Sequence, residues 1–109
     1  MIVTTTHAVE GKKVRSYRGI VFGEVIVGAN FIKDFKAGLT NFFGGRSGAY
    51  EQELQQARDS ALAEMKERAA AQGADAVLGM LVNYEVLGSN GQNMLMVTVC
   101  GTAVKLESL

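Results

Sequence analysis

The residues of this chain that could bind a metal or perform covalent chemistry are few and scattered. Among 109 residues there is one histidine, His7, one cysteine, Cys100, and five methionines. Thiolate, thioether and imidazole groups are the ligands that soft and borderline metal ions prefer. One His and one Cys cannot complete a four-ligand site, so a metal would need copies of these residues from several chains. The alternative interpretation is that Cys100, which alternates with apolar neighbours, is a small core residue and that His7 is merely exposed.

A glycine-rich loop at residues 44–48 is the second candidate site. Its sequence, Gly-Gly-Arg-Ser-Gly, opens onto a predicted helix, so main-chain N–H groups, Arg46 and Ser47 could together hold an anionic group. The loop lacks the lysine and the spacing of a Walker loop. The alternative is a tight connection in which Ser47 caps the helix that follows. The residues predicted to bind a ligand are Gly45, Arg46, Ser47, Tyr50 and Glu24.

Glu24 is unusual because it interrupts an apolar segment that runs from residue 19 to residue 29. A carboxylate buried without partners costs several kcal/mol. We therefore expect Glu24 either to serve a ligand or a proton, or to pair with an arginine such as Arg46 at a contact between subunits. The sequence shows no nucleophile with a base beside it, so no enzymatic activity is predicted.

Composition and charge narrow the classes of function. Hydrophobic residues make up 48% of the chain, and eleven Lys and Arg balance eleven Asp and Glu. Nucleic acid is not an expected partner, because a neutral chain lacks the basic footprint that such partners need. The N-terminus does not resemble a signal peptide, and the longest apolar run is too short and too charged to span a bilayer. These features predict one domain over residues 1–109, located in the cytoplasm and without a membrane partner.

Hydrophobic patterning predicts six elements in the order β-β-α-α-β-β. We expect strands at residues 2–6, 14–27, 76–87 and 93–106, and helices at 30–43 and 47–72. The second helix carries an apolar stripe of small residues. An Asn-Gly pair at residues 90–91 predicts a hairpin between the last two strands.

Strict alternation along each strand assigns side chains to two faces. It places Tyr17 on the face of Val21 and Leu78 on the face of Val82, opposite Leu81. Both faces of the long strands are apolar, whereas the helices come in one block and can cover only one face. A strand of ~14 residues would also span ~46 Å, more than the ~34 Å diameter of a compact chain of this size. We therefore expect bent strands and a closed ring of copies that share strand edges and cover the second face.

Several segments resemble the YbjQ family of small bacterial proteins, which is labelled "putative heavy-metal-binding". The resemblance extends over nearly the whole chain and is carried chiefly by Gly23–Asn30, Gly44–Glu51 and Met94–Val104. It implies an α+β subunit like that of dodecin, with helices on one face of a two-layer antiparallel sheet and the long strands in the order 1-3-2. It also implies a homopentamer or a decamer, with a transition or heavy metal as ligand. The alternative function is binding of a small anionic ligand by the Gly44–Ser47 loop or at a subunit junction.

Overall fold

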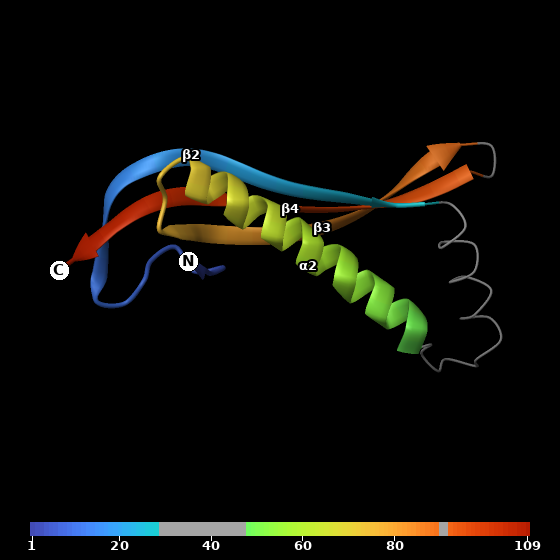
Figure 1. Cartoon of the computed structure of the whole chain (residues 1–109), viewed down its shortest axis with the longest axis horizontal. Helices are drawn as coiled ribbons and strands as arrows, with labels where there is room; N and C mark the ends of the chain where they lie inside the picture. The colour runs from blue at the N-terminus through green and yellow to red at the C-terminus, as the bar shows by residue number, and fades with distance from the viewer. Residues whose placement is uncertain (29–47, 90–91) are drawn as a thin grey trace.

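The computed structural model describes residues 1–28, 48–89 and 92–109, and in these residues the chain forms four strands and one helix. The α+β class, the long strands and the second predicted helix are confirmed, whereas the helix predicted at 30–43 lies outside the described residues. Figure 1 shows two layers, with the helix lying across one face of the sheet. The elements are β1 (Ile2–Val3), β2 (Lys12–Val27), α2 (Gly48–Ala71), β3 (Ala76–Ser89) and β4 (Gln92–Ser108).

The strands form one sheet in the order β1-β3-β4-β2. β4 pairs antiparallel with both β2 and β3, which confirms the order of the long strands and the predicted β3–β4 pairing. The expectation of a purely antiparallel sheet is wrong, because β1 pairs in parallel with β3, with Ile2 opposite Ala76. Both sides of β4 are already occupied, so β1 adds to the outer side of β3 and makes the sheet mixed.

The predicted face of Tyr17 is also wrong. The pairing of β2 with β4 shifts between Val14 and Ser16 and again between Tyr17 and Gly19, where Gly19 has a φ of 114°. Each shift inserts a residue and breaks the strict alternation. Tyr17 therefore lies on the same face as Ile20 and opposite to Val21. Figure 1 shows the bend of β2 in this part of the strand, as expected for a strand too long to run straight.

A similar irregularity changes the faces of β3. Its pairing with β4 shifts between Leu78 and Leu81, and Gly79 within this stretch has a φ of 61°. Leu78 consequently shares a face with Leu81, whereas the sequence pattern placed them on opposite faces. Val82 lies on the other face with the residues that pack against the helix.

Small side chains allow α2 to pack closely on one face of the sheet. The predicted stripe is confirmed, and an ideal Cβ added to Gly23 of β2 would lie only 1.8 Å from the main-chain oxygen of Ala61. No side chain larger than hydrogen fits between helix and strand at this point. The buried helix residues are Ala57, Ala61, Met65 and Ala69, and they pack against Val21, Val77, Val97, Val99 and Ala103 of the sheet.

The N-terminal segment covers one end of the opposite face. The N–H of Thr4 donates to the Val77 carbonyl at 3.0 Å, and the N–H of Gly79 donates to the Thr6 carbonyl at 2.9 Å. Val9 then packs on a second, smaller cluster that includes Leu78. This segment therefore closes the face only near the beginning of β3.

The rest of that face carries large apolar side chains in contact with solvent. We call it the open face. Its exposed apolar side chains include Ile20 (67%), Phe22 (43%), Ile26 (59%), Leu81 (61%) and Met94 (40%), and the residues between them include Glu24, Asn83, Thr98 and Cys100. The molecule is also elongated, with extents of 54 × 27 × 17 Å.

Asp75 joins the start of β3 to the end of β4. The Leu106 N–H donates to Asp75 Oδ1 at 2.8 Å, and Lys105 Nζ lies 3.6 Å from Oδ2. The hydrogen bond from Leu106 is the largest influence and lowers the pKa of Asp75; desolvation raises it and the charge of Lys105 lowers it, and the net result is a pKa below the ordinary value of 3.8. The ionised carboxylate therefore stabilises the folded chain.

We predict that Gly23→Ala destabilises the protein by about 1–3 kcal/mol or more, because the added methyl group collides with main-chain atoms that cannot rotate away. Gly28→Ala is the matched control, since a Cβ at Gly28 would meet nothing within 4 Å. Urea unfolding followed by circular dichroism measures both. Equal midpoints for the two variants would contradict the close approach of α2 to β2.

We predict that Asp75→Ala lowers the melting temperature at neutral pH but has little effect in acid. The pKa of Asp75 is depressed in the folded state, so its contribution is present above pH 3.8 and is lost as the pH falls through the lowered value. Thermal melts of wild type and variant from pH 7 to pH 2 test this. Asp59→Ala, at an exposed position of α2, is the control. A difference in melting temperature that stays constant across this range would show that Asp75 acts by another route.

Candidate functional site

Some of the predicted site residues belong to the described part of the chain and others do not. Gly45, Arg46 and Ser47 lie outside the described residues, so the anion-binding loop stays a prediction. Tyr50 belongs to the first turn of α2, which begins at Gly48. The remaining candidates, Glu24, His7 and Cys100, are all described and can be placed relative to one another.

Glu24 is exposed, which corrects the expectation that it is a buried carboxylate. It lies opposite Thr98 of β4, and Thr98 lies opposite Asn83 of β3. A row of three polar side chains thus crosses the otherwise apolar open face. The carboxylate needs no buried partner because no described residue covers this part of the sheet.

A shallow cleft adjoins the polar row on the β3 side. Its volume is about 500 Å³. Its lining residues carry an amide, a phenol, a carboxylate, a hydroxyl and a thioether, so it offers hydrogen-bonding groups but only one carboxylate. The lining residues are Asn83, Tyr84, Glu85, Met96 and Thr98.

Cys100 lies at the middle of the open face. It is half-buried, its thiol is free, and it is paired in register with Phe22 on one side and Leu81 on the other. The alternative interpretation of Cys100 as a small core residue is not confirmed within one copy, because Cys100 is only half-buried and lies on the face opposite α2. Apolar side chains flank the thiol on the two neighbouring strands, and Thr98 and Thr102 precede and follow it on the same face of β4.

His7 stands at the margin of the same face. With Tyr17 and Thr102 it lines a cleft of about 220 Å³, whose floor includes Leu78 and Gly79. Thr102 is two residues from Cys100 on β4, a separation of ~7 Å along the strand. His7 and Cys100 thus share a face but occupy different sites.

The sequence analysis missed this cleft and the parts that Tyr17 and Thr102 play in it. Strict alternation placed Tyr17 on the wrong face, and the cleft exists because Gly79 adopts a left-handed conformation beside His7. The only available signal was a glycine inside each strand pattern, which indicates an irregularity without saying how it changes the faces.

Among the described residues of one copy, neither His7 nor Cys100 belongs to a complete metal site. In the described part of the chain, no three His, Cys, Asp or Glu side chains come close enough together to hold a metal ion. The arrangement that the structure does show is a free thiol within a broad apolar surface. Such a surface can bind another protein surface, and it can hold a metal only if a second copy supplies further ligands.

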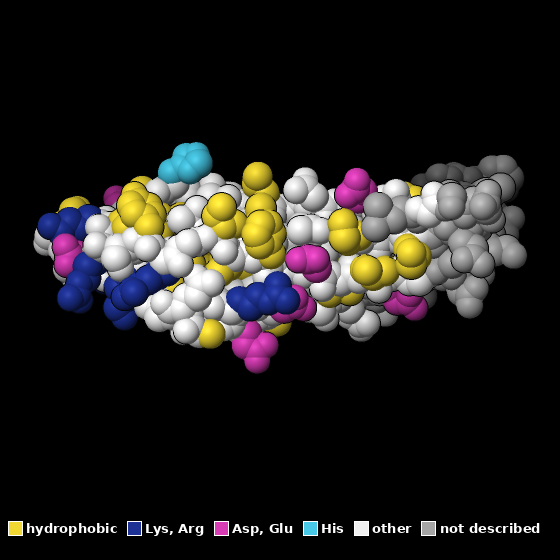
Figure 2. Space-filling model, turned by 90° about the horizontal axis from the view of Figure 1, so that it is seen from above, with side chains coloured by type: hydrophobic (Ala, Val, Ile, Leu, Met, Phe, Trp, Pro, Cys, Tyr) yellow, Lys and Arg dark blue, Asp and Glu magenta, His cyan; other side chains and the backbone are white. Residues whose placement is uncertain are grey.

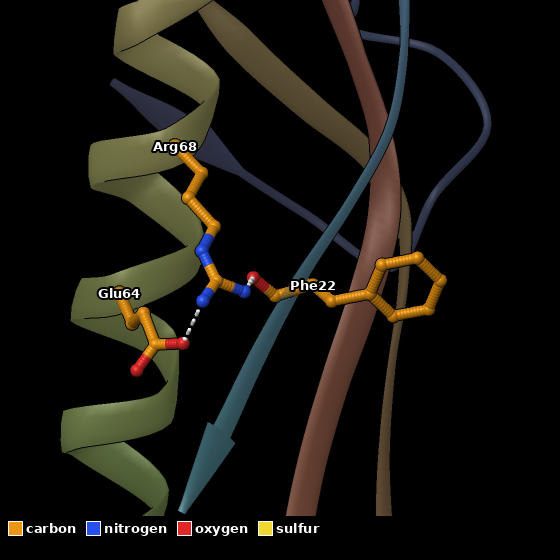
Figure 3. A network of polar contacts seen from close by, with 3 residues as sticks. All are labelled: Phe22, Glu64 and Arg68. Carbon is orange, nitrogen blue, oxygen red and sulfur yellow. Dashed lines mark hydrogen bonds and ion pairs between the residues drawn. The ribbon is translucent and has the colours of Figure 1, made fainter.

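Basic residues cluster at the start of β2. Figure 2 shows most of the visible basic side chains toward one end of the molecule, and acidic side chains both at that end and farther along it. Arg68 of α2 is outside this cluster, and it donates to the Phe22 carbonyl at 2.8 Å and forms an ion pair with Glu64 (Figure 3). The basic residues near the start of β2 are Lys12, Lys13, Arg15 and Arg18.

The one helix among the described residues is not apolar enough over its length to cross a membrane.

Comparison with known proteins places the chain in a family whose activity has not been determined. A UPF0145 protein from Acetivibrio thermocellus is 64% identical over 107 residues, covering 98% of this chain and 100% of the relative. Another from Clostridium kluyveri is 65% identical with the same coverage. A crystal structure of a DUF74-family protein of unknown function from Pediococcus pentosaceus has a TM-score of 0.67 at 20% identity, covering 98% of each chain. It shares the fold. The model of the YbjQ family, described as "Putative heavy-metal-binding", matches residues 1–107, and the chain belongs to this family.

Proposed function

We propose that this protein is a subunit of a cytoplasmic homo-oligomer that binds a soft metal ion between its subunits through Cys100. The observation that carries the proposal is the open face, where large apolar side chains and a free thiol lie together on one surface. The chain acts as a binding protein, and no catalytic step is assigned to it.

Self-association is supported by the size of the exposed apolar surface. Full burial of a large apolar side chain stabilises a structure by about 1.5–3 kcal/mol, and monomeric proteins rarely leave a contiguous surface of such side chains in water. A second copy is the occupant that fits, because equal numbers of acidic and basic residues leave little repulsion between copies. The elongated shape also supports contacts that extend beyond one subunit. The assembly that we propose is a dodecin-like ring of five copies, or a stack of two such rings, as the family resemblance implies.

Metal binding is supported by the position of the thiol together with the description of the family. In an assembly with rotational symmetry, equivalent residues near an axis approach one another. Cys100 lies at the middle of the surface that copies would cover, so several copies could place their thiols around one ion. A thiolate is the form that binds, so metal binding would release protons.

The second candidate function is binding of a small anionic ligand at the Gly44–Ser47 loop. It is favoured by the start of α2 at Gly48, because the free N–H groups of the first turn then follow the loop directly. This function depends on Arg46 and does not require Cys100. The two candidates can therefore be separated by substitution.

We predict that Leu81→Arg lowers the mass of the native particle toward that of one chain, because it places an uncompensated charge in the proposed contact. Leu109→Arg adds the same charge at an exposed C-terminal position away from the open face, and it should keep the wild-type mass. Light scattering after size-exclusion chromatography measures both. A wild-type particle with the mass of one chain would refute the assembly.

We predict that Cys100→Ser abolishes cadmium and zinc binding while keeping the wild-type mass. Calorimetry and the ultraviolet absorption of the thiolate–cadmium bond follow the titration in tag-free protein. His7→Gln and Arg46→Ala are the controls and should bind cadmium as the wild type does. Absence of heat and of the absorption band in the wild type would refute metal binding. Loss of phosphate binding only in Arg46→Ala would favour the anion-binding function.

A further inference from the structure

The second surface of interest is the free edge of β2. In the sheet order β1-β3-β4-β2, β2 is a terminal strand of the described part of the chain. A terminal strand presents unpaired N–H and C=O groups that can pair with a strand of another molecule. Only the main-chain groups of β2 that face outward and have no hydrogen-bond partner are available to such a strand.

The direction of the main-chain groups of β2 can be inferred from the hydrogen bonds that β4 forms. Val104 accepts a hydrogen bond from the Asp75 N–H at 3.0 Å, and the Leu106 N–H donates to the Asp75 side chain. Even-numbered residues of β4 therefore direct their main-chain groups toward β3, and odd-numbered residues direct theirs toward β2. The β2 residues paired with even-numbered positions must face the other way. These outward-facing residues are Ile20, Phe22, Glu24 and Ile26.

The Arg68 side chain forms a hydrogen bond with one of these outward-facing main-chain groups. Its Nη1 donates to the Phe22 carbonyl at 2.8 Å, across 46 positions of sequence, and Glu64 one turn earlier on α2 forms an ion pair with its Nη2. Figure 3 shows the guanidinium group between the helix and β2, with the Phe22 ring directed away from the helix. An incoming strand that paired with Phe22 would have to displace this guanidinium group.

The segment of β2 around Phe22 has a sequence that favours pairing with a strand of another molecule. Residues 20–27 read Ile-Val-Phe-Gly-Glu-Val-Ile-Val, and Glu24 is their only charged residue. Segments of this length with high β-propensity, low charge and no proline are prone to strand pairing between molecules. If two β2 edges paired antiparallel around Glu24, two carboxylates would lie opposite each other, and like charges in that position destabilise the pair.

We propose that Arg68 and Glu24 act together to prevent β2 of one copy from pairing edge to edge with β2 of a second copy. Arg68 occupies the Phe22 carbonyl, and the charge of Glu24 opposes antiparallel self-pairing. This assigns Glu24 a role on the strand edge, and the inference concerns a different surface from the open face. It stands whether or not the open face mediates assembly.

The test compares Arg68→Ala with the wild type by light scattering over a hundredfold range of concentration. We expect Arg68→Ala to form species at multiples of the wild-type mass, with a fraction that rises with concentration. Hydrogen exchange of the peptide covering residues 20–27 should slow in these species, because outward N–H groups become paired. Lys66→Ala makes the same charge change at an exposed position of α2 and should keep the wild-type mass. Glu64→Gln leaves the guanidinium group on Phe22 and should also keep it.

A second substitution tests whether the larger species formed by Arg68→Ala depend on the edge of β2. Arg68→Ala combined with Glu24→Pro should return to the wild-type mass, since proline removes an outward N–H and is tolerated on an edge strand. Wild-type mass for Arg68→Ala at all concentrations, or large species that survive Glu24→Pro or leave the exchange of residues 20–27 unchanged, would overturn the proposal. If circular dichroism shows that Arg68→Ala is unfolded, the Glu24→Thr variant tests the proposal instead. It should form the same species at high concentration, and its failure to do so would overturn the proposal.

Discussion

The close contact between α2 and β2 is the constraint on which the rest of the structure depends. At Gly23 the strand lacks a side chain, and the main chain of α2 at Ala61 occupies the space that a Cβ would need. Small residues along the helix continue this contact, and Met65 fills the layer beneath it. Because the helix lies so near to β2, Arg68, about two turns after Ala61 on α2, can reach the outer side of the strand.

The same packing leaves the other side of the sheet without a covering layer in the described residues. The N-terminal segment shelters only the end near Leu78, and the remaining face carries exposed apolar side chains around Cys100. A free thiol among apolar neighbours differs from a catalytic cysteine, since no described group stands beside it to activate it as a nucleophile. The chemistry that fits is association, together with ligation of a soft metal once more than one copy contributes.

The open face and the β2 edge place opposite demands on the protein. Association through the open face removes apolar side chains from water, whereas pairing of two β2 edges would join the sheets of two copies into one larger sheet. Only two side chains are involved, the guanidinium group of Arg68 on the Phe22 carbonyl and the carboxylate of Glu24 in an apolar segment. Each lies where a new strand would begin to pair. Under the two proposals, the protein would associate through its open face while pairing between its sheet edges is restricted.

The sequence by itself determined the positions of the long strands and of α2, and the pairing of β3 with β4. These features depend on local patterns: apolar periodicity over many residues and an Asn-Gly turn. It also indicated that the helices would cover one face only, since they come in one block. The family resemblance agreed with the order of the long strands, and it suggested metal without supplying the ligands.

Only the tertiary structure decided which side chains share a face. The shifts beside Gly19 and Gly79 depend on how β2 and β3 pair with β4, and they moved Tyr17 and Leu78 away from the faces that alternation assigned. The parallel pairing of β1 joins segments more than seventy residues apart, and the exposure of Glu24 depends on what lies above it. The physical reason is that alternation is a property of one strand, whereas register and cover are properties of the strands and helix that pack together.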